Sequence, residues 1–271
     1  MMISVLMSLY KKEKPDWFEK ALNSITANQE HRPDEVVLVC DGPITEEQEN
    51  VISRHEIAGC VPLVLVRLEE NRGLGTALNK GLEKCRGELV ARMDTDDIAR
   101  PERLRLQVEF MNAHPDVAAC GGSIAEFIKE GEIIREKHMP EMPDKVYRYG
   151  KTRNPLNHMT VMFRKEAVLA VGNYQHFPLL EDYHLWSRML AKGYQLANLG
   201  AVLVDARIGE TFAERRGGKE YWNWYRKLRK LQREWGFLNV PEYLVSLALT
   251  FVMTRQSAKA REKAYSLLRK N

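Results

Sequence analysis

Short apolar runs alternate with amphipathic stretches along the first hundred residues of the chain. The runs are apolar nearly throughout and are bounded by turn residues, which is typical of buried strands. Between them, apolar positions recur at helical spacing, as in the stretch that follows Pro15. This alternation predicts a parallel sheet with helices on both faces. The predicted strands are residues 3–8, 35–40, 61–68 and 89–93.

The pattern changes after a predicted helix at residues 101–113. Two strand patterns then flank a turn at Glu130-Gly131, so the second half of the sheet is expected to be mixed rather than parallel throughout. Helical spacing returns at residues 165–171 and 181–192. The remaining predicted strands are residues 117–129, 131–138, 160–163, 195–199 and 201–204.

The C-terminal part of the chain has a different character. Residues 221–235 alternate aromatic and basic side chains, and the fourteen residues 240–253 form an apolar run that is interrupted by Glu242. That run is too short to span a bilayer, which takes roughly 20 residues. It predicts either an interfacial helix or a helix packed on the body of the protein.

The charges are unevenly distributed. Residues 213–271 hold 14 Lys and Arg against 5 Asp and Glu, whereas the rest of the chain is mildly acidic. A basic tail on an acidic body indicates an anionic partner such as a membrane, a diphosphate or a nucleic acid. A solvated basic surface without a partner is the alternative.

The composition fits a globular protein of one large domain, or of one domain with a C-terminal extension. The four cysteines are widely spaced and form no CxxC pair, which favours reduced thiols over disulfides or a zinc site. No apolar stretch of signal-peptide length begins the chain. We therefore expect a cytoplasmic protein.

Candidate chemistry concentrates in the acidic stretch Asp94-Thr95-Asp96-Asp97, which directly follows a predicted strand. Three carboxylates within four residues repel one another unless a cation or strong donors offset their charge. Hard oxygen ligands suit Mg²⁺ or Mn²⁺. An acidic turn that caps the following helix is an equally good interpretation of this stretch alone.

Several segments, in their order and spacing, resemble the family 2 inverting glycosyltransferases of the GT-A fold. The similarity is greatest to bacterial enzymes that build O-antigen and exopolysaccharide repeat units. It implies an α/β fold with a mostly parallel central sheet flanked by helices, a GT-A domain at residues 1–212 and a basic, amphipathic helical extension at 213–271. The segments are SVLMSLYKKE, VCDGP, NRGLGTALNKGL, MDTDDIARPERL and LLEDYHLWSRM.

The resemblance implies a set of residues that bind a nucleotide-sugar donor. Asp41 would accept the uracil N3–H, which favours a UDP sugar, although a turn residue is the simpler interpretation of Asp41. Glycines before a helix N-terminus permit a diphosphate to approach. The implied donor-side residues are Leu9, Tyr10, Asp41, Asn71, Arg72, Gly73, Asp94, Thr95, Asp96 and Arg216.

The resemblance also implies the catalytic groups. Asp96 would hold the Mn²⁺ or Mg²⁺ ion with Asp97 as a supporting carboxylate, and Asp182 would be the base that deprotonates the acceptor. Two acids at a helix start are also explained by the helix dipole alone. Glu181, His158 and His184 are tentative acceptor contacts. His184 stands where the family often has Asp, so its role is open.

These features predict transfer of one sugar, a hexose from a UDP sugar, to a polyprenyl-diphosphate-linked acceptor. The basic extension would hold the enzyme on the anionic inner face of the cell membrane. The sequence has no QxxRW motif, which is the motif of processive synthases, so we expect a non-processive enzyme. Alternatives are a catalytically silent, membrane-associated binding module and a sugar-phosphate nucleotidyltransferase. The latter would show a Gly-rich loop where Tyr10-Lys11-Lys12-Glu13 stands. Only charge favours nucleic-acid binding, so we expect none.

Overall fold

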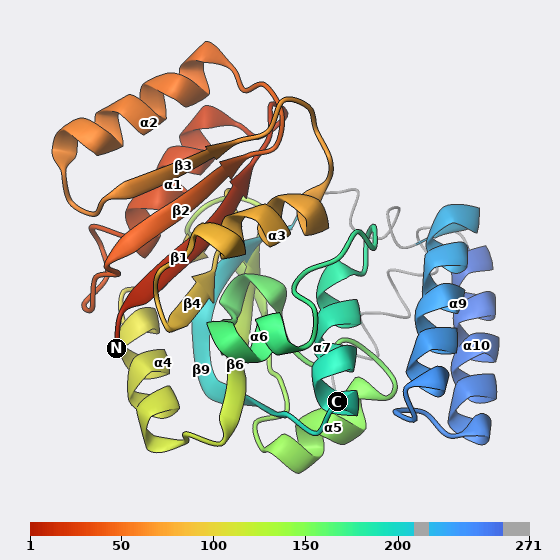
Figure 1. The fold of residues 1–271 in the computed structure, drawn as a ribbon. Helices are drawn as coiled ribbons and strands as arrows, with labels where there is room; N and C mark the ends of the chain where they lie inside the picture. The colour runs from red at the N-terminus through yellow and green to blue at the C-terminus, as the bar shows by residue number, and fades with distance from the viewer. Residues whose placement is uncertain (209–216, 257–271) are drawn as a thin grey trace.

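A computed structural model describes residues 1–208 and 217–256 of the chain. Its first half is a four-stranded parallel sheet in the order β3-β2-β1-β4 (Figure 1). The strands lie close to their predicted ranges and are almost entirely buried, apart from the edge strand β3. They are β1 (Ile3–Leu9), β2 (Glu35–Cys40), β3 (Leu63–Arg67) and β4 (Leu89–Arg92).

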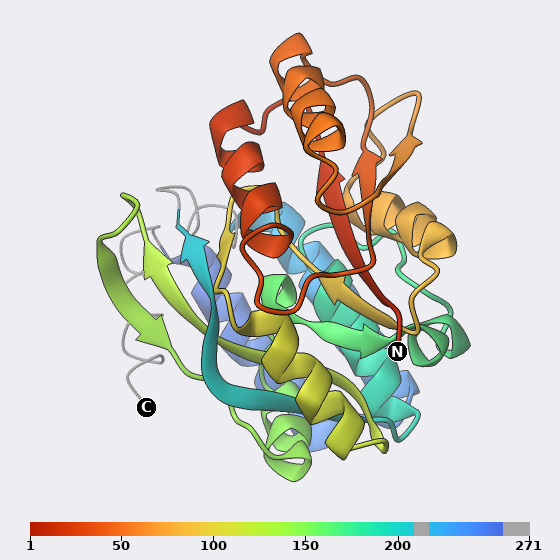
Figure 2. The same ribbon diagram turned by 90° about the vertical axis from the view of Figure 1, so that its left-hand side faces the viewer.

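Helices cover both faces of this sheet (Figures 1 and 2). On one face, α1 (Pro15–Ile25) and α2 (Glu46–Ala58) pack their apolar side chains against β1 and β2. A capping box formed by Thr45 and Gln48 begins α2. On the other face, α3 (Leu74–Lys84) packs Ala77, Leu78 and Leu82 into a second core cluster. The α/β class that the sequence predicts is confirmed.

The second half extends the sheet with mixed strand directions. Beyond β4 the order is β8-β6-β9-β5, in which only β6 and β9 pair in parallel, and β7 pairs with β6. The elements are β5 (Ile98–Ala99), α4 (Arg103–Ala113), β6 (Val117–Phe127), β7 (Ile133–Lys137), α5 (Pro143–Gly150), η1 (His158–Thr160), β8 (Met162–Arg164), α6 (Lys165–Ala170), α7 (Glu181–Ala191) and β9 (Gln195–Arg207).

Two features of this half differ from the prediction. Strand β9 is continuous where two strands were expected, because Gly200 does not end a strand. The register with β6 passes from Gly122–Leu199 to Ser123–Val202, so Gly200 lies in a bulge. Helix α5 and the short strand β5 were not predicted, and β5 has only two residues, which is too few to establish a period.

Two further helices, α9 (Gly218–Glu234) and α10 (Val240–Arg255), follow the sheet. Helix α9 lies against the body of the protein, and α10 lies beside α9 (Figure 1). The buried side of α9 contributes Tyr221, Tyr225 and Leu228 to a cluster with residues that precede and begin α7. Helix α9, which contains the aromatic and basic stretch, therefore packs on the body of the protein. Within residues 1–208 and 217–256, no helix has both the length and the apolar character needed to traverse a bilayer.

All four cysteines are free thiols, in agreement with the sequence prediction. Cys40, Cys85 and Cys120 are buried in the core, and Cys60 is half-buried. Burial raises the pKa of Cys85 to about 12, because the thiolate is poorly solvated there. These side chains act as small apolar residues in packing.

Candidate active site

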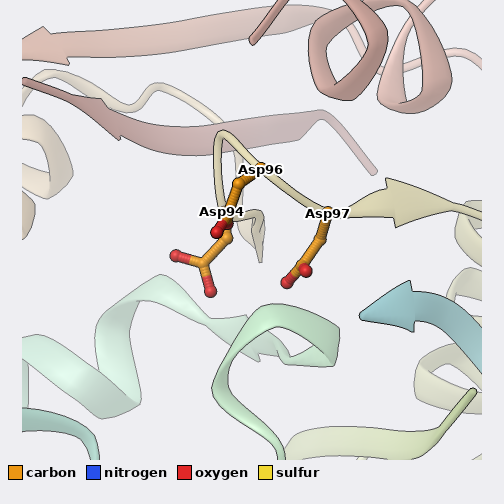
Figure 3. Close-up of side chains that lie close together, drawn as sticks. All are labelled: Asp94, Asp96 and Asp97. Carbon is orange, nitrogen blue, oxygen red and sulfur yellow. The ribbon is translucent and has the colours of Figure 1, made fainter. Parts of the chain in front are cut away.

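The acidic stretch forms a loop between β4 and β5, at the carboxyl end of the parallel sheet (Figure 3). Carboxylate oxygens of Asp94, Asp96 and Asp97 all lie within 4.8 Å of one another. Thr95 Oγ1 donates a hydrogen bond to the carbonyl of Ser8 at 3.4 Å, which fastens the loop to the end of β1. The loop therefore lies where ligands of parallel α/β sheets bind.

Electrostatics make this loop a good fit for a divalent cation. Burial and the neighbouring charge of Asp94 raise the pKa of Asp96 to about 6, and burial with the charges of Asp96 and Asp94 raises the pKa of Asp97 well above its usual range. Three close carboxylates of this kind are hard oxygen ligands whose negative charges repel one another. The donor set suits Mg²⁺ or Mn²⁺.

The three carboxylates differ in how much of their bonding capacity is already used. Asp97 Oδ1 accepts the backbone N–H of Arg207 at 2.7 Å, and the Asp97 side chain is buried. Asp94 and Asp96 are more exposed. This arrangement agrees with a supporting part for Asp97 and leaves Asp94 and Asp96 as the carboxylates best able to reach a ligand.

Arg92, the last residue of β4, forms a buried ion pair with Asp94 that sequence reasoning missed. Its side chain is 2% exposed, and its Nε and Nη1 atoms have no hydrogen-bond partner among the described residues. A buried cation adjacent to Asp94 fixes the orientation of that carboxylate and reduces the repulsion within the loop. The sequence signal that could have identified this ion pair is the position of Arg92, a cation inside an apolar run just before the acidic stretch.

Arg207, the last residue of β9, supports the loop from the other side and was also missed. Its Nε donates to the carbonyl of Asp96 at 3.1 Å. Its guanidinium lies 4.2 Å from the ring centroid of Trp17 and 4.6 Å from that of Phe127. The stacked rings hold the cation in place, so the acidic loop is attached to β9 as well as to β1.

The predicted donor residues of the first half gather at the same edge. The backbone N–H of Asp41 donates to the carbonyl of Leu9 at 2.7 Å. The Asp41 carboxylate accepts hydrogen bonds from the backbone N–H groups of Arg72 at 2.7 Å and Gly73 at 2.9 Å. Asn71 Nδ2 donates a hydrogen bond to the backbone carbonyl of Asp41. Asp41 therefore positions the loop before α3, and its contact with a base stays a prediction. The Arg72 side chain is more than half exposed and pairs with Glu70.

The first turn of α7 presents the second acidic pair of the site. Asn154 Nδ2 donates to Asp182 Oδ2 at 2.5 Å, and Asp182 Oδ1 accepts the N–H of Tyr183 at 2.7 Å. Burial, with a contribution from the Asp182 charge, raises the pKa of Glu181 to about 7. The charges of Asp182, Glu181 and Asp94 all act on the buried hydroxyl of Tyr174. The acidic loop and the α7 pair thus share one electrostatic environment.

Gly75 sets the distance between α3 and this pair. A Cβ added at Gly75 would lie 2.4 Å from the carbonyl oxygen of Gln175 and 3.3 Å from Cβ of Glu181. We expect Gly75→Ala to destabilise the fold by about 1–3 kcal/mol, because the loop before α7 must shift to make room for the added methyl group. This net loss is expected even though Ala is the better helix former by about 1 kcal/mol. Urea unfolding measures the change, with the neighbouring Thr76→Ala as control. Equal unfolding midpoints for wild type and Gly75→Ala would show that the loop yields freely.

The two histidines predicted at the acceptor side lie in different places. His158 Nε2 is 3.0 Å from the hydroxyl of Tyr174, and burial with the charge of Arg92 lowers its pKa well below the usual value. It therefore belongs to the shared acidic environment. His184 is stacked on Phe177 with ring centroids 4.3 Å apart and lies against Trp235. The structure places His184 between α7 and α9 and does not bring it to the other predicted residues.

The buried His184 gives stability a pH dependence. Burial, with the charges of Arg188 and Lys227, lowers its pKa from 6.5 to about 3. Below pH 6.5 the unfolded chain binds a proton at this residue that the folded chain does not, so stability falls as pH falls toward 3. Between pH 7.5 and pH 5 the loss from this residue is about 2 kcal/mol.

The variant His184→Phe keeps an aromatic ring against Phe177. Between pH 7.5 and pH 5 we expect its free energy of unfolding, measured in urea, to fall by about 2 kcal/mol less than that of wild type. His31→Phe at an exposed site serves as the control. An identical pH dependence in wild type and His184→Phe would contradict this account.

The remaining predicted donor residue, Arg216, lies outside the described residues. Among those that are described, the structure brings together Leu9, Tyr10, Asp41, Asn71, Arg72, Gly73, Asp94, Thr95 and Asp96 at the strand ends, with His158, Glu181 and Asp182 beside them. The Tyr10 carbonyl accepts a hydrogen bond from Gln48 at 3.1 Å, which holds the loop after β1.

A mixed sheet of this order, with an acidic loop after its fourth parallel strand, has the GT-A fold. The model of the family "Glycosyl transferase family 2" matches residues 4–171, so the chain belongs to that family.

Relatives and solved structures agree with this assignment. The chain is 41% identical to the amylovoran biosynthesis glycosyltransferase AmsE of Erwinia amylovora, over 93% of this chain and 94% of that one. It is 39% identical to the Escherichia coli UDP-Gal:alpha-D-GlcNAc-diphosphoundecaprenol beta-1,3-galactosyltransferase, over 80% of this chain and 78% of that one. The structure of S. aureus TarS 1–349 in complex with UDP-GlcNAc shares the fold, with a TM-score of 0.67 and 19% identity, over 93% of this chain and 72% of that one.

Proposed function

We propose that the protein is a metal-dependent, inverting glycosyltransferase that moves one hexose from a UDP sugar to a lipid-linked saccharide in bacterial surface polysaccharide synthesis. The observation that carries the proposal is the shared environment of the acidic loop and Asp182, at the strand ends of a family 2 glycosyltransferase. One group of residues then serves the donor and the other serves the acceptor.

On the donor side, Asp96 is the proposed metal ligand, and Asp94 is oriented by Arg92 for the sugar and ribose. A bound Mg²⁺ or Mn²⁺ would neutralise the leaving diphosphate as a Lewis acid, a contribution of several kcal/mol. Gly73 directly precedes α3 and has a φ of +83°. A Cβ added at Gly73 would have no described atom within 4 Å, apart from atoms of Gly73 and its chain neighbours. The backbone can therefore be approached closely by a diphosphate at a helix N-terminus.

On the acceptor side, Asp182 is the proposed base. It would take the proton of the acceptor hydroxyl while that oxygen forms its bond to the anomeric carbon, and the bond between that carbon and the UDP oxygen breaks on the opposite face. Asn154 holds one carboxylate oxygen and the Tyr183 N–H the other, so the orientation of the base is fixed before the acceptor arrives. Attack from the opposite face inverts the configuration.

The proposal for the substrates is supported by the relatives. The name of the Escherichia coli enzyme gives UDP-Gal as its donor and a diphosphoundecaprenol-linked GlcNAc as its acceptor. We extend this chemistry to the present chain as a UDP-hexose and a polyprenyl-diphosphate-linked sugar. Residues 1–212 would carry out the transfer, and residues 213–271 would form an extension at the cytoplasmic face of the membrane.

Release of UDP from a panel of UDP sugars, with Mn²⁺ or Mg²⁺ and a synthetic lipid-diphosphate-linked sugar, tests the proposal. We expect turnover with one donor that requires both the metal and the acceptor. Binding of UDP without turnover on any acceptor would favour a catalytically silent binding module. Absence of UDP binding with metal present would refute the proposal altogether.

A further inference from the structure

Helix α10 has its apolar and polar sides reversed relative to a helix of a water-soluble domain. Its most buried side chains are hydroxyl residues at helical spacing, namely Ser246, Thr250 and Thr254. The large apolar side chains of its opposite side are 48–64% exposed. We call this side the α10 outer face; it consists of Val240, Leu244, Val245, Leu249 and Val252.

The orientation of α10 is fixed by contacts at both of its ends. At the start of the helix, Glu242 forms an ion pair with Lys151 at 2.8 Å and completes a capping box with Asn239. Near its end, the ring of Phe251 packs edge-on against Trp222 of α9, with centroids 5.4 Å apart. The outer face is therefore exposed because of how the helix is held, and not because the helix lacks contacts.

Small hydroxyl residues between two helices, with leucine and valine facing outward, form the arrangement that suits an apolar surrounding medium. In water, the five side chains of the outer face expose apolar surface along one side of the helix. Such a patch marks a site of contact with a protein or a membrane.

Cations lie beside this patch. Trp222 marks the side of α9 that faces α10, and Lys219 and Arg226 stand one helical turn before and after it. The same stripe continues through the exposed residues Lys230 and Arg233. An apolar face flanked by a basic stripe fits an anionic lipid surface. A second copy of the chain would bring the same cations toward one another, which opposes pairing through this face.

We propose that the α10 outer face enters the headgroup region of an anionic bilayer, with the basic stripe of α9 at the lipid phosphates. The inference extends the proposed function, which requires a lipid-linked acceptor, by identifying the inserting surface. It also revises the sequence interpretation, because the tyrosines of α9 are used in packing on the body and not at the membrane.

The experiment measures cosedimentation of the full chain with vesicles of phosphatidylglycerol and phosphatidylethanolamine. We expect the double variant Leu244→Gln with Leu249→Gln to reduce the partition coefficient about tenfold or more, since two apolar contacts with lipid are lost. The matched control is Ile128→Gln with Ile134→Gln, two similarly exposed isoleucines of the β6–β7 hairpin, which should bind as wild type does. Vesicles of phosphatidylcholine alone should bind wild type more weakly.

Light scattering and UDP release with a short-chain, water-soluble acceptor complete the test. Both variants should keep the oligomeric state and the UDP release of wild type, so that failure of the transferase proposal remains separate from failure of this one. The inference is overturned if wild type does not bind anionic vesicles, or if the α10 variant binds them as well as wild type does. It is also overturned if the α10 variant dissociates an oligomer, because a second copy would then cover the face.

Discussion

Replacing Asp182 with Asn is expected to lower kcat by about 10²–10⁴-fold while UDP binding is retained. The amide is isosteric and can still accept the N–H of Tyr183, but it cannot take the proton of the acceptor hydroxyl. Steady-state UDP release with donor and acceptor measures kcat, and calorimetry measures UDP affinity in the presence of Mn²⁺.

Glu181→Gln is the matched control for this change, since it removes the neighbouring carboxylate and leaves Asp182 in place. We expect a much smaller loss of kcat, because Asn154 directs the carboxylate of Asp182 and not that of Glu181 in our account of the base. A wild-type kcat in Asp182→Asn, or a larger loss in Glu181→Gln, would assign the base to Glu181.

Replacing Asp96 with Ala is expected to abolish metal-dependent donor binding. Without this carboxylate the loop retains Asp94, which is paired with Arg92, and Asp97, which accepts a backbone N–H. Asp97 is buried, so Asp94 alone remains able to reach a ligand, and a single carboxylate that is paired with a cation should hold a divalent metal only weakly. The loss of several kcal/mol of transition-state stabilisation should lower kcat about 10²–10⁴-fold.

Calorimetric titration of UDP with and without Mn²⁺ measures the effect. For Asp96→Ala the two titrations should coincide, whereas wild type should bind far more tightly with the metal. Asp144→Ala, at an exposed position of α5, should behave as wild type does. Retention of the metal effect in Asp96→Ala would move the ligand assignment to Asp94 or Asp97.

The sequence was sufficient for the elements with a clear period. Strands β1, β2 and β4 are largely apolar runs that are soon followed by polar residues, so their carboxyl ends and the loops there were predicted closely. Strand β9 was not, because a glycine inside a strand pattern can mark an end or a bulge, and only pairing with β6 decides between them.

The partners of the site residues were harder to predict than the residues themselves. Arg92 and Arg207 act through tertiary contacts, one with Asp94 two residues away and the other across more than a hundred residues of sequence. Periodicity carries no information about such pairs. His184 was a tentative acceptor contact with an open role, because it stands where the family often has Asp. Two positions along a helix point to nearly opposite sides, and the structure places the ring of His184 against Phe177.

The tail shows the same limit. Its aromatic and basic alternation in residues 221–235 indicated a membrane surface, yet Tyr221 and Tyr225 are buried against the body of the protein. The exposed apolar side chains belong to α10 instead. Composition predicted an amphipathic extension, and only the packing shows which helix presents which side.

The measurement that tests the central claim most directly is the anomeric configuration of the product. NMR of the saccharide formed from an α-linked UDP-hexose and a lipid-diphosphate-linked sugar reports the new linkage. A β linkage, formed by wild type and absent with Asp182→Asn, is the result that our account predicts. An α linkage would contradict it, because Asp182 would then not act as the base of a single displacement.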